Sequence, residues 1–287
     1  MRRVWTSVLL ILVFVAVPVV ADDQRYDQAW LEQEAADRAA ARGEYSVALR
    51  RYAWALEMKT RFPEAFVGMA RIYRSQSDIL LAERYYLEAL ASANQLEIPD
   101  QIYAIRMELA SLYDEIRLGE DDLRKYRDQL LLIIQDDPVF SRDEPPGQRQ
   151  MMVQTLLDSG LNRVLVLYRL NFPQALEAHR RYATYLLEET PVRQQGAAVD
   201  HLLFAVVEIV GRALEAVIRH DYDYQFTSIT QLYRDAQKYS SILTYLRSEN
   251  LTAVLRDLQY TLTILPDGAG AKAAAEIGRE LQAIAAE

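Results

Sequence analysis

Hydrophobic positions recur with a helical period along the chain, and one such pattern occurs twice. The stretches "ALRRYAWAL" (48–56) and "AERYYLEAL" (82–90) match when one is displaced by 34 residues. Among the matching letters are two alanines, a tyrosine and a leucine: Ala48, Tyr52, Ala55 and Leu56, followed by Ala82, Tyr86, Ala89 and Leu90. Their spacing of i, i+4, i+7 and i+8 places them on one face of an α-helix. The pattern therefore predicts two equivalent amphipathic helices.

An earlier helix precedes each of these two. Gly43 is suited to end a helix that runs from about Ala29 to Arg42. In the next unit Pro63 stands where a helix can begin, because its missing N–H is harmless in the first turn. The repeating unit is thus predicted to be a helix, a tight turn and a second helix.

The alanines have a physical reason to recur. Ala82 and Ala89 are expected where the two helices of a pair meet, with Ala70 opposite them. Small side chains let two helix axes approach to about 8 Å, against about 10 Å for large ones. Because one hairpin cannot bury its own apolar face, Tyr73 and Tyr86 are expected to fill the groove toward the following unit.

A helical hairpin with a 34-residue period resembles the tetratricopeptide repeat (TPR). The second unit matches that family's pattern with Phe66, Met69, Ala70, Tyr73, Ala82, Tyr86 and Ala89. The first unit matches with Ala36, Gly43, Tyr45, Ala48, Tyr52 and Ala55. It departs from the pattern at Ala39, where a tyrosine is usual, and at Thr60, which replaces the closing proline.

A third, degenerate unit follows at a wider offset of 40 residues. Met69, Ala70, Tyr73 and Tyr86 recur there as Leu109, Ala110, Tyr113 and Tyr126. The residues 22–138 are therefore predicted to form a TPR-like array of about three repeats.

The second half of the chain is also predicted to be helical. The prolines and glycine of 139–150 indicate a linker. Helix-period apolar residues follow at 151–157, 161–170, 175–187 and 198–219, with a degenerate repeat near 230–266 and a capping helix over 269–286. We predict an all-α fold, an α-solenoid whose second half (151–287) consists of degenerate helical repeats with a C-terminal capping helix.

The first 21 residues have the layout of a secretory signal peptide. Arg2 and Arg3 precede an apolar run, and small residues end at Ala21 before two aspartates. We expect cleavage after Ala21 and a periplasmic location. The alternative is an uncleaved anchor that tethers the protein to a membrane, because Val4–Ala21 is near the lower length limit for crossing a bilayer.

Composition narrows the function classes. The chain has no cysteine, so packing alone must hold it. Without Arg2 and Arg3 it has 30 basic and 41 acidic residues, a net charge of −11, which argues against nucleic acid as a partner. No stable membrane insertion is expected after signal cleavage.

Motifs for chemistry are missing from the sequence. The three histidines lack the helical spacing of an H-E-x-x-H zinc site, and no phosphate-binding glycine loop or nucleophile elbow occurs. His220, Asp221 and Asp223 are interpreted as a capping and turn segment rather than as metal ligands. We predict that the protein is not an enzyme and uses no cofactor or metal.

The resemblance implies where a partner would bind. TPR arrays bind peptides or partner domains on a concave side lined by set positions of the first helix of each pair. In this sequence those positions are Trp30, Gln33, Asp37, Glu64, Val67, Arg71, Arg74, Ala104, Met107, Ser111 and Asp114. Trp30 and Arg71 stand out, because aromatic and arginine side chains dominate interface energetics.

The resulting hypothesis is an exported TPR scaffold or adaptor that binds protein partners in a bacterial envelope assembly, such as a secretion, cell-wall or flagellar-motor complex. The alternative is a periplasmic small-molecule-binding helical repeat protein associated with solute transport. In that case the helices over 198–219 and 229–246 are expected to enclose a cavity.

Overall fold

The computed structural model describes residues 25–117, 119–136, 173–190, 195–225, 227–239, 248–264 and 270–286. Every regular element in these ranges is a helix. The chain separates into two compact units, Met1–Ile116 and Arg117–Glu287. Within each unit neighbouring helices pack in series, which confirms the predicted all-α, solenoid-type fold class.

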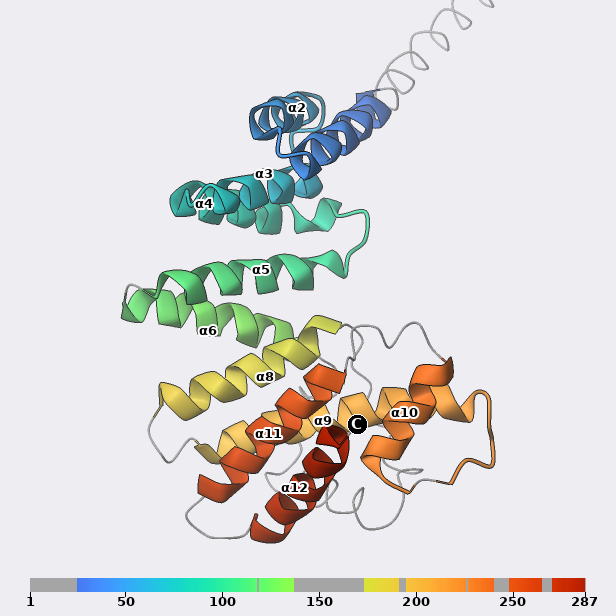
Figure 1. Ribbon diagram of the computed structural model, residues 1–287. Helices are drawn as coiled ribbons and strands as arrows, with labels where there is room; N and C mark the ends of the chain where they lie inside the picture. The colour runs from blue at the N-terminus through green and yellow to red at the C-terminus, as the bar shows by residue number, and fades with distance from the viewer. Residues whose placement is uncertain are drawn as a thin grey trace, which may run out of the picture. The chain divides into compact units, whose positions relative to one another are not determined.

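The first helix described in the first unit spans residues 25–41. The unit continues with α2 (Tyr45–Met58), α3 (Pro63–Ser75), α4 (Ile79–Ala91), the 3₁₀ turn η1 (Ala93–Gln95) and α5 (Gln101–Ile116). Each of the helices α3, α4 and α5 packs against the one before it, as Figure 1 shows. The predicted hairpins are therefore present as pairs of successive antiparallel helices.

The recurring alanines lie in the helix contacts, as their spacing predicts. Ala48 and Ala55 on α2, and Ala82 and Ala89 on α4, are all 0% exposed. The tyrosines of the same stripe are buried with them, since the exposed fraction is 1% for Tyr52 and 0% for Tyr86. Small side chains at the contacts and one large ring beside them account for the repeated letters.

The turns repeat as well as the helices. Gly43 and Ser77, 34 residues apart, both have left-handed backbone, with φ of 77° and 61°. In each turn the amide of this residue bonds to the carbonyl three residues back and the next amide to the carbonyl five residues back, all at 2.9 Å. This is the Schellman ending of a helix, which uses a left-handed residue to satisfy the last carbonyls. A third left-handed residue, Arg117 (φ 34°), follows Ser77 by 40 residues, the wider offset that the sequence pattern indicates.

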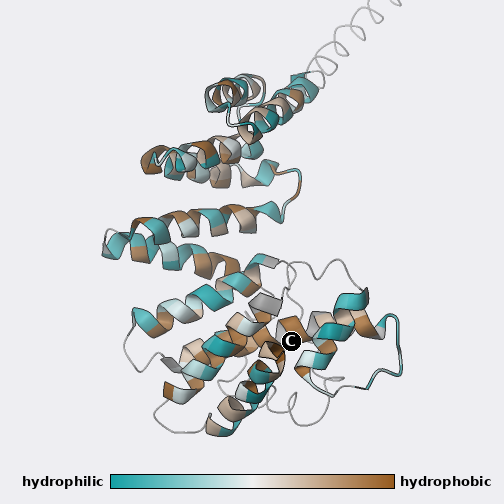
Figure 2. Cartoon of the chain, in the orientation of Figure 1, coloured by the Kyte–Doolittle hydropathy of each residue, from teal (hydrophilic) through white to brown (hydrophobic). Residues whose placement is uncertain are grey.

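The second unit contains six described helices. They are α6 (Glu120–Gln135), α8 (Pro173–Glu188), α9 (Gln195–Ile218), α10 (Ile229–Tyr239), α11 (Ser248–Ile264) and α12 (Ala271–Ala285). The long helix α9 packs against α8, α10 and α11, and α12 packs on α11 and α10. Figure 2 shows hydrophobic and hydrophilic residues side by side on α10 and α12, as amphipathic helices require.

The core of this unit lies along α9. Its apolar stripe is at most 5% exposed at every predicted position, namely Val199, Leu202, Leu203, Val206, Ile209, Val210, Ala213 and Val217. At the far end of the chain Gly270 lets two helices approach, because a Cβ there would lie 2.6 Å from Leu262 Cδ2. The predicted capping helix over 269–286 is thus observed as α12 packed on α11.

Several predictions fall outside the described residues. These are the signal segment 1–21, the linker 139–150 and the helices over 151–157 and 161–170. The observed division falls between α5 and α6, the two helices that the sequence pattern joins as a third hairpin. Among the described helices, none combines the length and the apolar character needed to cross a bilayer.

Candidate functional site

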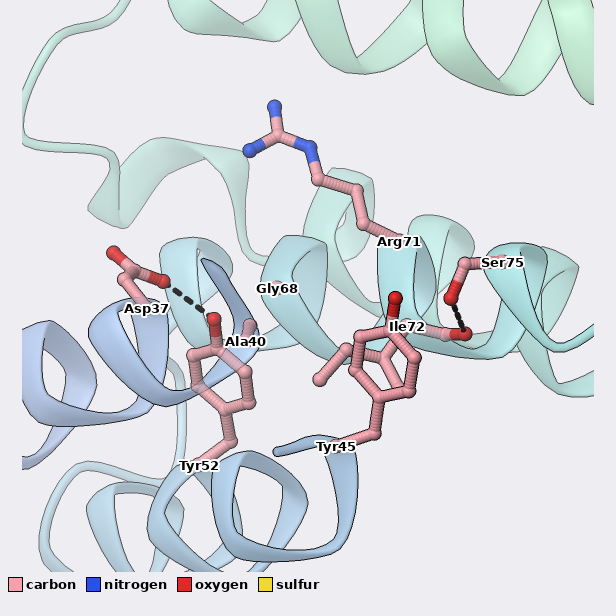
Figure 3. A pocket seen from close by; sticks show the side chains of 8 residues that line it. All are labelled: Asp37, Ala40, Tyr45, Tyr52, Gly68, Arg71, Ile72 and Ser75. Atoms are coloured by element: carbon pink, nitrogen blue, oxygen red, sulfur yellow. Dashed lines mark hydrogen bonds between the residues drawn. The ribbon is translucent and has the colours of Figure 1, made fainter. Parts of the chain in front are cut away.

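An open pocket of about 320 Å³ lies in the first unit, between the helix over 25–41, α2 and α3. Figure 3 shows the residues that line it: Asp37, Ala40, Tyr45, Tyr52, Gly68, Arg71, Ile72 and Ser75. Ala40, Gly68 and Ile72 form its apolar part, and two tyrosines of α2, Tyr45 and Tyr52, also line it (Figure 3). Two of the predicted partner-binding residues, Asp37 and Arg71, contribute its charged groups.

The Asp37 carboxylate is held by two neutral donors. The Tyr52 hydroxyl donates to Asp37 Oδ1, and Gln33 Nε2 donates to Asp37 Oδ2 at 2.6 Å. Burial, the hydrogen bond to Asp37 and the charge of that carboxylate all raise the pKa of Tyr52. The phenol therefore remains a hydrogen-bond donor to Asp37 at any physiological pH.

Gly68 is required for this arrangement. A Cβ at position 68 would lie 2.2 Å from Cζ of Tyr52, inside the volume of the ring. Tyr52 thus crosses from α2 over the backbone of α3 to reach Asp37 on the first helix. The pocket wall is built by a close approach that only a glycine permits.

Arg71 points out of the pocket toward α5. Its Nε and one terminal nitrogen donate to the two oxygens of Glu108, at 2.9 and 2.6 Å, and the Tyr86 hydroxyl donates to the same carboxylate at 2.9 Å. The hydrogen bond to Glu108 raises the pKa of Arg71. Such a bidentate pair is stronger and more directional than a single ionic contact. It ties α3 to α5 and balances the guanidinium charge.

A second pair of the same kind lies one turn further along α3. Arg74 forms a bidentate contact with Glu115 of α5, with Nε at 3.2 Å from Oε2. Both arginines of α3 that the sequence assigns to partner binding therefore bind carboxylates of α5.

Trp30 belongs to a separate aromatic cluster. Its ring meets Phe62 edge to face at 4.7 Å, and the ammonium of Lys59 lies 5.0 Å from the Trp30 ring. The same ammonium lies 4.3 Å from the Phe62 ring and 4.4 Å from that of Tyr26. A cation over several aromatic faces is attracted by their quadrupoles. The Trp30 ring is thus already in contact with Phe62 and Lys59 of this chain, and it does not line the pocket.

The other predicted partner-binding residues are placed as follows. Gln33 and Val67 are buried, with exposed fractions of 9% and 7%. Glu64 Oε1 accepts from the Glu97 amide at 2.9 Å, which ties the start of α3 to the segment before α5.

On α5, Ser111 Oγ donates to the Met107 carbonyl at 2.9 Å, and Ala104, Met107, Ser111 and Asp114 are half-buried. None of these α5 residues lines the pocket.

Sequence reasoning missed Tyr45, Tyr52 and Ser75 as lining residues, and Glu108 as the partner of Arg71. The tyrosines occupy repeat positions, which the spacing assigns to the core. Tyr52 is indeed 1% exposed, yet its hydroxyl reaches the pocket. The 34-residue repeat pattern does not indicate that the hydroxyl of this buried tyrosine reaches a pocket.

The second unit contains a buried histidine pair. His179 Nδ1 and His201 Nδ1 lie 2.9 Å apart, with the Phe204 ring 4.6 Å from His179 and the Tyr182 ring 4.9 Å from His201. One ring nitrogen must donate and the other accept, so the two rings hold α8 to α9. Over the described part of the chain, no three potential ligands are grouped as a metal would need.

The segment at His220 has the contacts of a helix end. His220 Nδ1 lies 3.1 Å from the Ala216 carbonyl, and the Asp223 amide donates to the Asp221 side chain at 3.2 Å. These hydrogen bonds are those expected of a capping and turn segment.

Comparison with known proteins adds little to this picture. No family model matches the chain. A protein of Treponema pallidum (strain Nichols), described as uncharacterized, is 24% identical over 226 residues, which cover 72% of this chain and 58% of that protein. The chain thus spans less than two thirds of that relative's length.

Among solved structures the chain is similar to BtubC (BKLC) from P. vanneervenii, with a TM-score of 0.32 and 14% identity over 92% of this chain and 91% of that one. These values establish neither a family nor a function, so the functional argument rests on the pocket.

Proposed function

We propose that the protein is an exported helical-repeat adaptor of the TPR type, which binds a segment of a partner protein in the pocket of its first unit. The observation that carries this proposal is that Asp37 and Arg71 line one open pocket. Both belong to the positions that the TPR resemblance assigns to partner binding. They come from different hairpins, so the pocket depends on the stacking of repeats.

The character of the pocket supports a partner segment over a free small molecule. Sites for small molecules bury most of the ligand surface in a cleft or cavity. This pocket is open to solvent and lies among three helices, with exposed Asp37, Arg71 and Ser75 on its rim. A peptide can place one side chain in it while its backbone continues across the neighbouring helices, which adds contacts that a small ligand lacks.

A steric block of the rim tests the proposal. Ser75 is exposed on the pocket rim, whereas Ser46 is exposed on α2 and does not line the pocket. We expect Ser75→Tyr to lower partner capture from native envelope extracts about tenfold, because filling the rim removes on the order of 1.4 kcal/mol of binding. Ser46→Tyr is the matched control and is expected to capture the same proteins as wild type.

The melting temperature of both variants serves as the folding check. Equal capture by Ser75→Tyr and wild type would exclude the pocket as the partner site.

The proposal includes export to the periplasm, on the strength of residues 1–21. Mass spectrometry of protein purified from cells tests it, and a mature amino terminus at Asp22 is the expected result. A terminus at Met1 would mean that the signal segment is retained and that the protein is tethered to a membrane.

A further inference from the structure

We propose that the pocket of the first unit takes a cationic side chain, an arginine or lysine of the partner segment, with Asp37 as its counter-ion. This inference rests on the proposed function, and it names the chemistry of the partner residue that enters the pocket.

Asp37 is able to act as a counter-ion. Its two oxygens accept hydrogen bonds from Tyr52 and Gln33, which are both neutral, and within the described residues it forms no ion pair. Asp37 is exposed, and each carboxylate oxygen can accept a further hydrogen bond. A cation placed there forms a charge-assisted hydrogen bond, about twice as strong as one between neutral groups.

Arg71 is already paired with a carboxylate of this chain. Its guanidinium is engaged by both oxygens of Glu108 and is directed away from the two tyrosines (Figure 3). An anionic ligand would therefore meet a guanidinium whose charge is already balanced by the Glu108 carboxylate beside it. Asp37, Arg71 and Glu108 together carry a formal charge of −1, so a cation meets a favourable field without displacing any group.

The size and lining of the pocket suit one long basic side chain. The half-buried ring of Tyr45 lines the pocket together with the Tyr52 hydroxyl, and aromatic faces attract cations. Ala40, Gly68 and Ile72 offer apolar surface against which the methylenes of a long basic side chain can pack. The volume of about 320 Å³ is at the small end of ligand sites, which suits one side chain.

The charge of the whole chain agrees with this choice. At −9 it attracts basic segments over distances of about a Debye length, near 8–10 Å at physiological salt. Association with a basic partner is therefore expected to slow as salt is added.

The test uses four small probes on the full chain: the N-acetyl amides of arginine, lysine, citrulline and glutamate. Citrulline has the shape of arginine without its charge. Each probe is titrated to tens of millimolar while the amide signals of Gly68, Ile72 and Ser75 are followed by ¹H–¹⁵N NMR. We expect the arginine or lysine probe to shift these signals, the citrulline probe to bind at least tenfold more weakly, and the glutamate probe to leave them unchanged.

Asp37→Asn is the decisive variant. Asparagine keeps an oxygen that can accept from Tyr52, so the fold is expected to persist while the charge is lost. The apparent dissociation constant of the cationic probe is expected to rise about tenfold, as for loss of one charge-assisted hydrogen bond. Glu34→Gln removes an exposed carboxylate of the same helix that does not line the pocket, and is expected to bind the probe as wild type does. If Asp37→Asn unfolds, Tyr45→Leu replaces it and is expected to weaken the same probes through loss of one aromatic wall.

Two results would overturn the inference: citrulline binding as well as arginine, or Asp37→Asn binding the cationic probe as well as wild type. The Ser75→Tyr experiment separates this failure from failure of the proposed function. If Ser75→Tyr still abolishes partner capture while the charge is irrelevant, the pocket binds a partner but not through a basic residue. If Ser75→Tyr does not change partner capture and Asp37→Asn does not change probe binding, the proposed function and this inference are both wrong.

Discussion

Tyr52 shows how one residue serves both the core and the pocket. Its ring is buried against the backbone of Gly68, and its hydroxyl orients the Asp37 carboxylate. The repeat spacing predicts the burial of this ring, because Tyr52 and Tyr86 share one stripe position. It does not predict the polar contact, since the partner of Tyr52 lies on the preceding helix and that of Tyr86 on the following one.

The same limit applies to the arginines of the predicted site. Their places on one face of α3 follow from helical periodicity. Their pairing with Glu108 and Glu115 depends on the distance between α3 and α5, which a segment of extra residues before α5 changes from one repeat to the next. The composition of the pocket could therefore be predicted only in part, at Asp37 and Arg71.

Burial of Tyr52 and Tyr86 predicts loss of stability at alkaline pH. Burial is the main cause that raises the pKa of both phenols above the ordinary value of 10.0, with the carboxylates of Asp37 and Glu108 adding to it. Below pH 10 each tyrosine is protonated whether the chain is folded or not, so its full contribution is present. Above pH 10 the unfolded chain loses these protons and the folded one retains them, so the unfolding free energy falls by about 1.4 kcal/mol per pH unit for each phenol.

The measurement is urea unfolding at pH 9, 10 and 11. Tyr52→Phe is expected to start from a lower stability, because its hydrogen bond is gone, but to fall less steeply between pH 10 and 11. Tyr222→Phe, at a side chain that is 87% exposed, is the control and is expected to keep the wild-type slope. If the unfolding free energy falls equally steeply with pH in wild type, Tyr52→Phe and Tyr222→Phe, the Tyr52 phenol ionises freely in the folded state.

At the scale of the helices, the apolar pattern predicts most of what is observed. The helix expected over 175–187 is α8 (Pro173–Glu188), and that over 198–219 is α9 (Gln195–Ile218). A stripe of apolar residues specifies which face is buried and how long the helix runs. The division between α5 and α6 has no counterpart in the pattern, because it depends on contacts between helices distant in sequence.

The helix ends carry a prediction of their own. Ser77 adopts the left-handed backbone that Gly43 adopts in the preceding repeat, and a residue with a Cβ pays about 1–2 kcal/mol there. Ser77→Gly is therefore expected to raise the unfolding free energy by about 0.5–1 kcal/mol, after allowance for the greater freedom of glycine in the unfolded chain.

Thermal unfolding followed by circular dichroism measures this change. Ser46→Gly, at an exposed position inside α2, is the control and is expected to lose stability, because glycine disfavours a regular helix. A loss of stability in Ser77→Gly as well would mean that the Ser77 side chain stabilises the turn.

At the scale of the whole molecule, the two compact helical units differ in organisation. The first unit presents a pocket built from stacked hairpins, whereas the second is organised around the long buried helix α9. The acidic net charge of −9 gives the chain a general preference for basic partners. The proposed adaptor role thus depends on the pocket of the first unit and on the electrostatic field of the acidic chain.

Site-specific photo-crosslinking in the native cell tests the central claim most directly. A photoreactive phenylalanine replaces Tyr45 inside the pocket in one strain and Leu80, which is 78% exposed on α4 and does not line the pocket, in another. The account predicts that the label at position 45 crosslinks one discrete partner beside a lysine or arginine, and that the label at position 80 does not. A crosslink to that partner from position 80 with none from position 45 would contradict it.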